Sequence, residues 1–103
     1  MAELFPTPEQ ARFKWEQKAT VYLSYYPNIS ELRKNAIINR KIVIGLTDSD
    51  VLFICGDPTT INKTVGPWGV DEQWVYSSIN EYAGTCHDHY YYFDNGILTS
   101  YQK

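Results

Sequence analysis

The fold of this chain is built around one stretch near its C-terminus, Tyr90-Tyr91-Tyr92-Phe93-Asp94-Asn95-Gly96-Ile97-Leu98-Thr99-Ser100-Tyr101. Asn95-Gly96 between two apolar runs is the strongest short-range signal for a two-residue β-hairpin turn. The turn sets the register of the two strands: Asp94 pairs with Ile97, Phe93 with Leu98, Tyr92 with Thr99, Tyr91 with Ser100 and Tyr90 with Tyr101.

Side chains alternate along a strand, so the hairpin has two faces. The face with the Phe-Leu pair should pack on helices, and it carries Tyr91, Phe93, Leu98 and Ser100. The other face carries Tyr90, Tyr92, Thr99 and Tyr101. On a preceding strand over Gln73–Tyr76, we expect Trp74 and Tyr76 to share the inner face and Gln73 and Val75 to point outward.

Three helices are predicted before the strands. Thr7-Pro8-Glu9-Gln10 is a capping box with proline at the first helical position, and the helix runs to Pro27. Its apolar stripe is Ala11, Trp15, Ala19, Tyr22 and Tyr26. A shorter helix runs from Asn28 or Ser30 to about Arg40, with Leu32, Ala36 and Ile37 inward.

The third helix has the clearest boundaries. Thr47 with Asp50 is a second capping signature, Gly56 suits the residue after a helix end, and Pro58 forbids continuation. Val51, Ile54 and Cys55 are its expected inward residues. A first strand over 59–65 and a turn over 66–69 follow, and a polar loop runs from Ser77 to Asp88.

Helices first and strands last predict an α+β fold, with N-terminal helices packed on one face of an antiparallel sheet of three to four strands. With 103 residues, we expect a single domain, with a helical extension over 7–40. Nine scattered Lys and Arg residues against twelve Asp and Glu exclude the charge pattern of a nucleic-acid-binding protein. No run is long enough to span a membrane.

Residues 42–102 resemble the SmpA/OmlA family, which includes a subunit of the outer-membrane β-barrel assembly machinery. The matching positions are Gly45, Leu46, Thr47, Val51, Gly56, Pro58, Trp74, Tyr76, Phe93, Asn95 and Gly96. The resemblance implies a helix-plus-sheet binding module without catalysis, and a fold shared with β-lactamase-inhibitor-protein-like modules. It therefore implies a protein partner in the bacterial envelope, and a soluble inhibitor or accessory protein that blocks a partner's surface is the alternative.

The best candidate site is the tyrosine-rich face of the sheet, because tyrosine supplies large contact area and a hydroxyl group at low entropic cost. We expect partner contacts from Tyr90, Tyr92, Thr99, Tyr101, Gln73, Val75 and Trp68, the last in the 66–69 turn. A homodimer through this face is one arrangement. The alternative is that Trp15, Tyr22 and Tyr26 cover the face as a second small core.

Other chemistry has weaker signals. Cys86, His87 and His89 carry metal-ligand atoms, but a fourth ligand and a paired motif are missing. This segment supports the alternative of a small metal-binding protein; the leading hypothesis needs no metal or cofactor. No motif surrounds Cys55, His87 or His89 that would make a nucleophilic catalyst, so we expect no enzyme.

The compartment is left open by the sequence. The start "MAELFPTPEQ" lacks the basic and apolar regions of a signal peptide. The expectation is the periplasm or outer membrane if a leader was removed, and the cytoplasm otherwise. Cys55 and Cys86 form one disulfide in an oxidising compartment or stay as two thiols in a reducing one.

Overall fold

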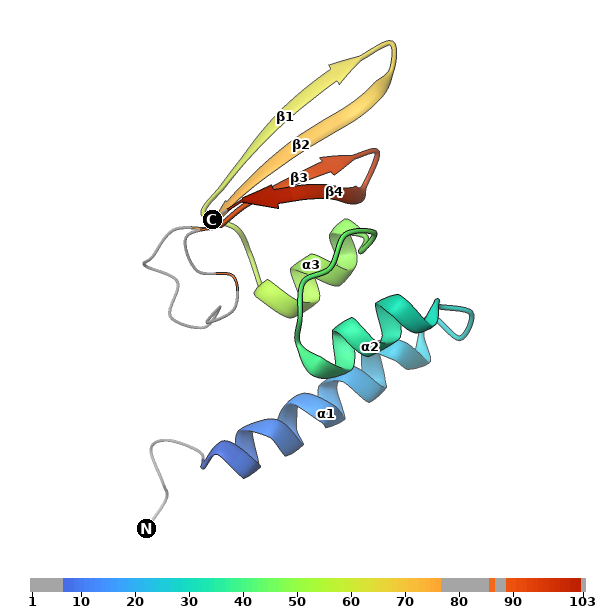
Figure 1. The fold of residues 1–103 in the computed structure, drawn as a ribbon, viewed down its shortest axis with the longest axis vertical. Helices are drawn as coiled ribbons and strands as arrows, with labels where there is room; N and C mark the ends of the chain where they lie inside the picture. Colours follow the sequence, from blue (N-terminus) through green and yellow to red (C-terminus); the bar gives the residue numbers. More distant parts are fainter. Residues whose placement is uncertain (1–6, 77–85, 87–88, 103) are drawn as a thin grey trace. The chain divides into compact units, whose positions relative to one another are not determined.

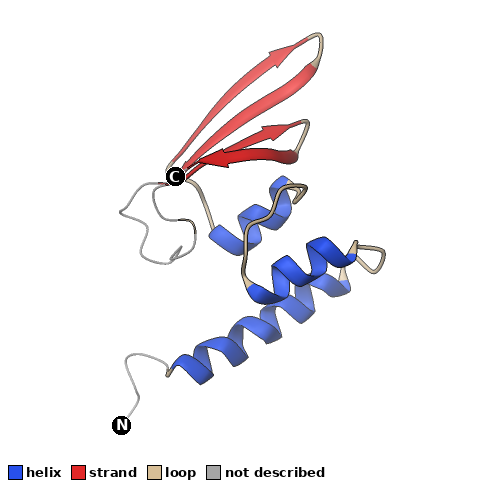
Figure 2. Cartoon of the chain, viewed as in Figure 1, coloured by secondary structure: helices blue, strands red, loops and turns tan. Residues whose placement is uncertain are grey.

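The computed structural model of the chain describes residues 7–76, 86 and 89–102. Three helices precede a four-stranded antiparallel sheet, which confirms the predicted α+β class (Figures 1 and 2). The chain forms two compact units, Met1–Asn39 and Arg40–Lys103.

The first unit is a pair of helices, α1 (Pro8–Ser24) and α2 (Glu31–Asn39). The predicted capping box is present: Thr7 N donates to Gln10 Oε1 at 2.9 Å, and Gln10 N donates to Thr7 Oγ1 at 3.1 Å. The indole N–H of Trp15 donates to the carbonyl of Ile37 at 2.9 Å, which joins the two helices.

The inward face of the first unit is only partly as predicted. Ala19, Ala36 and Ile37 are buried as expected. Leu32, predicted inward, is 57% exposed, because the face of α2 that holds Ala36 and Ile37 continues through the half-buried Arg33 instead. Ala11 and Tyr26, placed in the apolar stripe of α1, are also exposed, and α1 ends before Tyr26.

The second unit begins with α3 (Asp48–Cys55), whose boundaries are as the capping signals predict. Thr47 N donates to Asp50 Oδ2 and Asp50 N donates to Thr47 Oγ1, both at 3.1 Å. Gly56 ends the helix with a φ of 76°, a conformation that favours glycine. The predicted inward residues Val51, Ile54 and Cys55 are buried.

The sheet has the order β1 (Thr60–Gly66), β2 (Gly69–Tyr76), β3 (His89–Asp94) and β4 (Ile97–Gln102). β2 starts four residues before the expected Gln73, because the turn that precedes it is tighter than predicted. Gly66 pairs with Gly69, so only Pro67 and Trp68 form the loop.

One face of the sheet packs on α3 and forms the core of this unit. It buries Trp74, Tyr76, Tyr91, Phe93 and Leu98 as predicted. Both ends of α3 are tied to the sheet: Thr47 bridges to Ile97, and the Tyr76 hydroxyl donates to the carbonyl of Gly56 at 2.7 Å. A disulfide joins Cys55, at the end of α3, to Cys86.

The β3–β4 hairpin differs from its predicted register. Its turn is as expected, with positive φ at Asn95 and Gly96, and Phe93 pairs with Leu98. The register then shifts by one residue at a β-bulge, so that the remaining pairs are Tyr92 with Ser100, Tyr91 with Tyr101 and Tyr90 with Gln102. The predicted pairs of Tyr92 with Thr99, Tyr91 with Ser100 and Tyr90 with Tyr101 are therefore wrong.

Because of the bulge, two side chains of β4 lie on the face opposite to the predicted one. Ser100 moves to the face away from α3, and Tyr101 moves to the α3 side, where its ring lies 5.9 Å from that of Tyr91. Thr99 is the extra residue, and its hydroxyl donates to the carbonyl of Tyr92 at 3.2 Å. Leu98 is fixed from outside the hairpin, because Gly45 N donates to its carbonyl and its own N–H donates to Leu46 O.

Candidate functional site

The face of the sheet that points away from α3 is the candidate site, and we call it the outer face. Strand alternation and the observed register give its members. They are Thr60, Asn62, Thr64, Asp71, Gln73, Val75, Tyr90, Tyr92, Asp94, Ile97, Ser100 and Gln102.

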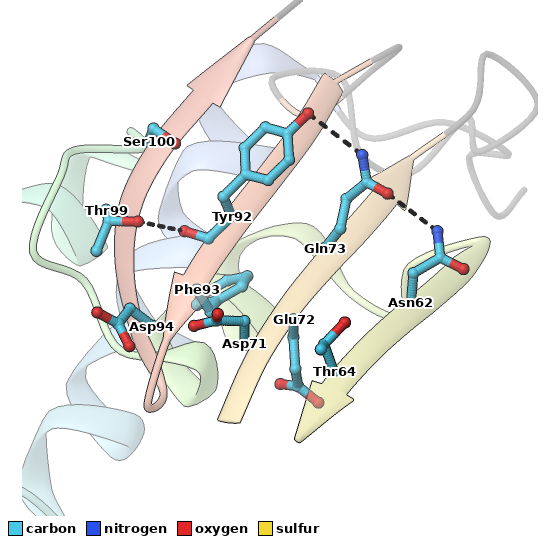
Figure 3. A pocket seen from close by; sticks show the side chains of 10 residues that line it. All are labelled: Asn62, Thr64, Asp71, Glu72, Gln73, Tyr92, Phe93, Asp94, Thr99 and Ser100. Carbon is cyan, nitrogen blue, oxygen red and sulfur yellow. Dashed lines mark hydrogen bonds between the residues drawn. The ribbon is translucent and has the colours of Figure 1, made fainter. Parts of the chain in front are cut away.

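A row of hydrogen bonds crosses all four strands on this face. Asn62 Nδ2 on β1 donates to Gln73 Oε1 on β2 at 3.0 Å. Gln73 Nε2 in turn donates to the Tyr92 hydroxyl on β3 at 3.2 Å (Figure 3). The same hydroxyl accepts from Gln102 Nε2 on β4 at 3.0 Å. We call Asn62, Gln73, Tyr92 and Gln102 the polar ladder.

The ladder crosses a shallow groove of about 540 Å³. Thr64, Asp71 and Asp94 line the end of the groove toward the two turns, and Thr99 and Ser100 line its β4 side (Figure 3). The ladder side chains are held by one another, and a surface that is held in this way loses less entropy on binding.

Trp68 in the β1–β2 turn is exposed but held in place. Its indole N–H donates to Asp71 Oδ2 at 2.8 Å, although 59% of the residue is accessible to solvent. The six-membered ring lies against Gly66, where a β-carbon would collide with it. The absence of a side chain at Gly66 therefore lets the indole lie over the end of β1.

The β3–β4 turn is anchored to β2 of the β1–β2 hairpin. Asn95 Oδ1 accepts from Val70 N at 2.8 Å, and Asn95 N donates to Val70 O at the same distance. The side chain of Asn95 also fills the space beside Gly69, whose φ of 124° favours glycine. These contacts hold the two turns side by side at one end of the outer face.

The structure brings most of the predicted site residues together, with one exception. Tyr90, Tyr92, Gln73 and Val75 lie on the outer face, with Thr99 and Trp68 at its borders. Tyr101, predicted to join them, is on the α3 side because of the bulge. The prediction of a three-tyrosine face is therefore corrected to two tyrosines, of which Tyr90 is 41% exposed.

Several groove residues were missed by the sequence reasoning. Asn62, Ser100 and Gln102 belong to the outer face, and so do Asp71 and Asp94, which pair directly across β2 and β3. A signal for the two carboxylates exists in the sequence: if β2 is started at Gly69, Asp71 falls on the same face as Gln73.

The metal hypothesis loses a ligand in this structure. The sulfur of Cys86 is bonded to Cys55 and is not available as a thiolate. His87 and the side chain of His89 lie outside the part of the chain that is described. Among the described residues, no group of three His, Cys, Asp or Glu side chains is placed to hold a metal ion.

The comparisons with known proteins give no assignment. No family model, no curated protein and no solved structure matches this chain. Among the described residues, no helix combines the length and the apolar character needed to cross a membrane.

Proposed function

We propose that this protein is a non-enzymatic protein–protein interaction module that binds its partner through the outer face. The observation that carries the proposal is the polar ladder, which fixes hydrogen-bonding groups from all four strands across one open groove. An open surface with tyrosine and amide side chains at its centre is typical of protein-binding sites.

The bacterial envelope is the compartment that we favour for this function. Disulfides persist in oxidising compartments, and Cys55 is bonded to Cys86 within the core unit. The resemblance of residues 42–102 to the SmpA/OmlA family implies the same location. We therefore propose an assembly or scaffold component of the envelope in preference to a soluble cytoplasmic inhibitor.

The proposal can be tested by photo-cross-linking from two tyrosine positions. Tyr90 and Tyr101 lie on neighbouring strands and are similarly exposed, at 41% and 46%, but they belong to opposite faces. A photoreactive phenylalanine analogue placed at either position samples one face. We expect a discrete protein adduct in cells from position 90 and none from position 101.

The controls separate binding from folding. Both substituted proteins should show the circular dichroism spectrum of the parent. An adduct of twice the chain mass would identify a second copy as the partner on the outer face. An adduct from position 101 alone, or from neither position, would contradict the proposal.

A further inference from the structure

We propose that the turn end of the outer face binds a cationic side chain of the partner, arginine in preference to lysine. The inference rests on the proposed function, because it assigns a chemistry to the partner of that same face. The site comprises Trp68, Asp71 and Asp94.

Two aspartates lie side by side on neighbouring strands at this end. Asp71 on β2 and Asp94 on β3 are register partners, and Figure 3 shows both on the groove side. Like charges directly opposite in a sheet are destabilising. The fold thus places two acidic residues together at the end of the groove.

Within the described part of the chain, few groups compensate the charge of these two aspartates. Asp71 accepts one hydrogen bond from the Trp68 indole, and the Asp94 side chain has no hydrogen bond or ion pair with any described residue. Lys63 is the one lysine or arginine in the four strands. Its register places it on the α3 side, opposite Glu72. On the outer face, the strands therefore carry carboxylates but no lysine or arginine.

Trp68 adds a second recognition element beside the carboxylates. Its ring is exposed, yet the contact with Gly66 and the bond to Asp71 fix its orientation. A guanidinium group stacks on an indole face and forms paired hydrogen bonds with carboxylates. Arginine fits this combination better than lysine, because the lysine ammonium is compact, more strongly hydrated and not planar.

The rest of the groove fits the segment that would carry the arginine. The polar ladder lies one row from Asp71 and Asp94, since Gln73 and Tyr92 are two residues from them along β2 and β3. Its amide and hydroxyl groups can accept or donate hydrogen bonds. On the side of the polar ladder, the neighbours of the arginine should therefore be small polar residues.

The test uses three synthetic heptapeptides of serine and threonine with arginine, glutamine or glutamate at the centre. Each is titrated into the full chain, and the NMR signals of the Trp68 indole N–H and of the Asp71 and Asp94 amides are followed. We expect the arginine peptide to bind at least about ten-fold more tightly than the glutamine peptide, and more weakly in high salt. The glutamate peptide should give no saturable shift.

Variants separate the charge from the ring. D94N should weaken the arginine peptide about ten-fold. G66A adds a β-carbon that displaces the indole, and it should weaken binding while both carboxylates remain. D57N removes an exposed carboxylate from the loop between α3 and β1 and should leave the affinity unchanged.

Two results would overturn the inference. One is equal binding of the three peptides; the other is the absence of a shift at Trp68 with the arginine peptide. Neither result bears on the cross-link from position 90, so the charge preference can fail while the proposed function stands, and the reverse also holds.

Discussion

Tyr76 connects β2 to the end of α3 through a single hydrogen bond, from its hydroxyl to the carbonyl of Gly56. The side chain is almost fully buried. Burial raises the pKa of Tyr76 above its ordinary value, and the nearby Tyr91 and Asp57 raise it further. Burial, followed by the neighbouring Tyr101, also raises the pKa of Tyr91. Both hydroxyls therefore stay neutral to a higher pH in the folded protein than in an unfolded chain.

These two residues predict a loss of stability in alkali. Tyrosine ionises near pH 10 in an unfolded chain, so the unfolded state releases protons first as the pH rises. Both residues contribute fully to the free energy of unfolding below about pH 10. Above that pH, each contribution falls by about 1.4 kcal/mol per pH unit. Urea unfolding between pH 8 and pH 11 measures this slope.

A matched pair of variants tests the origin of the slope. Y76F should lower the free energy of unfolding at neutral pH by about 1 kcal/mol, through loss of the bond to Gly56, and should reduce the alkaline slope. Y25F alters a tyrosine that is exposed and should change neither quantity. An unchanged slope in Y76F would show that Tyr76 ionises equally in both states.

At the scale of elements, the features that a short window of sequence determines were predicted well. The capping boxes at Thr7 and Thr47 depend on residues three apart, and both helix starts are as predicted. The Asn95-Gly96 turn is equally local, and it sets the first pairs of the hairpin correctly.

The bulge in β4 was not predictable in the same way. It lies beside Leu98, whose backbone is held by Gly45 and Leu46 from a distant part of the chain. A register deduced from the turn alone contains no information about that contact. One wrong register therefore accounts for both incorrect predictions, the outward position of Tyr101 and the inward position of Ser100.

The start of β2 was missed for a different reason. The sequence predicts a four-residue turn over 66–69, whereas Gly66 and Gly69 pair with each other and leave a two-residue loop. The longer strand brings Asp71 opposite Asp94, so this local misreading hid the acidic end of the groove.

The disulfide ties the end of α3 to the chain just before β3. Cys55 and Cys86 are 31 residues apart, and closing a loop of that length contributes about 3 to 4 kcal/mol in the chain-entropy account. We expect the free energy of unfolding to fall by about 3 to 4 kcal/mol in the double variant C55A/C86A or in a reducing agent. Urea unfolding measures this loss as a lower midpoint. Equal midpoints with and without the reducing agent, in a protein shown to carry the bond, would contradict this expectation.

In the second unit, one face of the sheet packs against α3 and forms the core, and in the proposed function the other face binds the partner. The aromatic residues of the strands divide accordingly: Tyr90 and Tyr92 point outward, and the α3 side holds Trp74, Tyr76, Tyr91, Phe93 and Tyr101. Under the proposed function, the run of four consecutive aromatics in β3 supplies both the core and the binding surface.

The affinity of the partner for two single variants tests directly whether the outer face is the binding surface. Once the partner has been identified by cross-linking, its dissociation constant is measured for Y90A and for Y101A. We predict that Y90A weakens binding about ten-fold or more with little change in the free energy of unfolding, as for an exposed contact residue. Y101A should bind as the parent does and lose stability through its contact with Tyr91. Weaker binding by Y101A with unchanged binding by Y90A would contradict the assignment of the outer face as the binding surface.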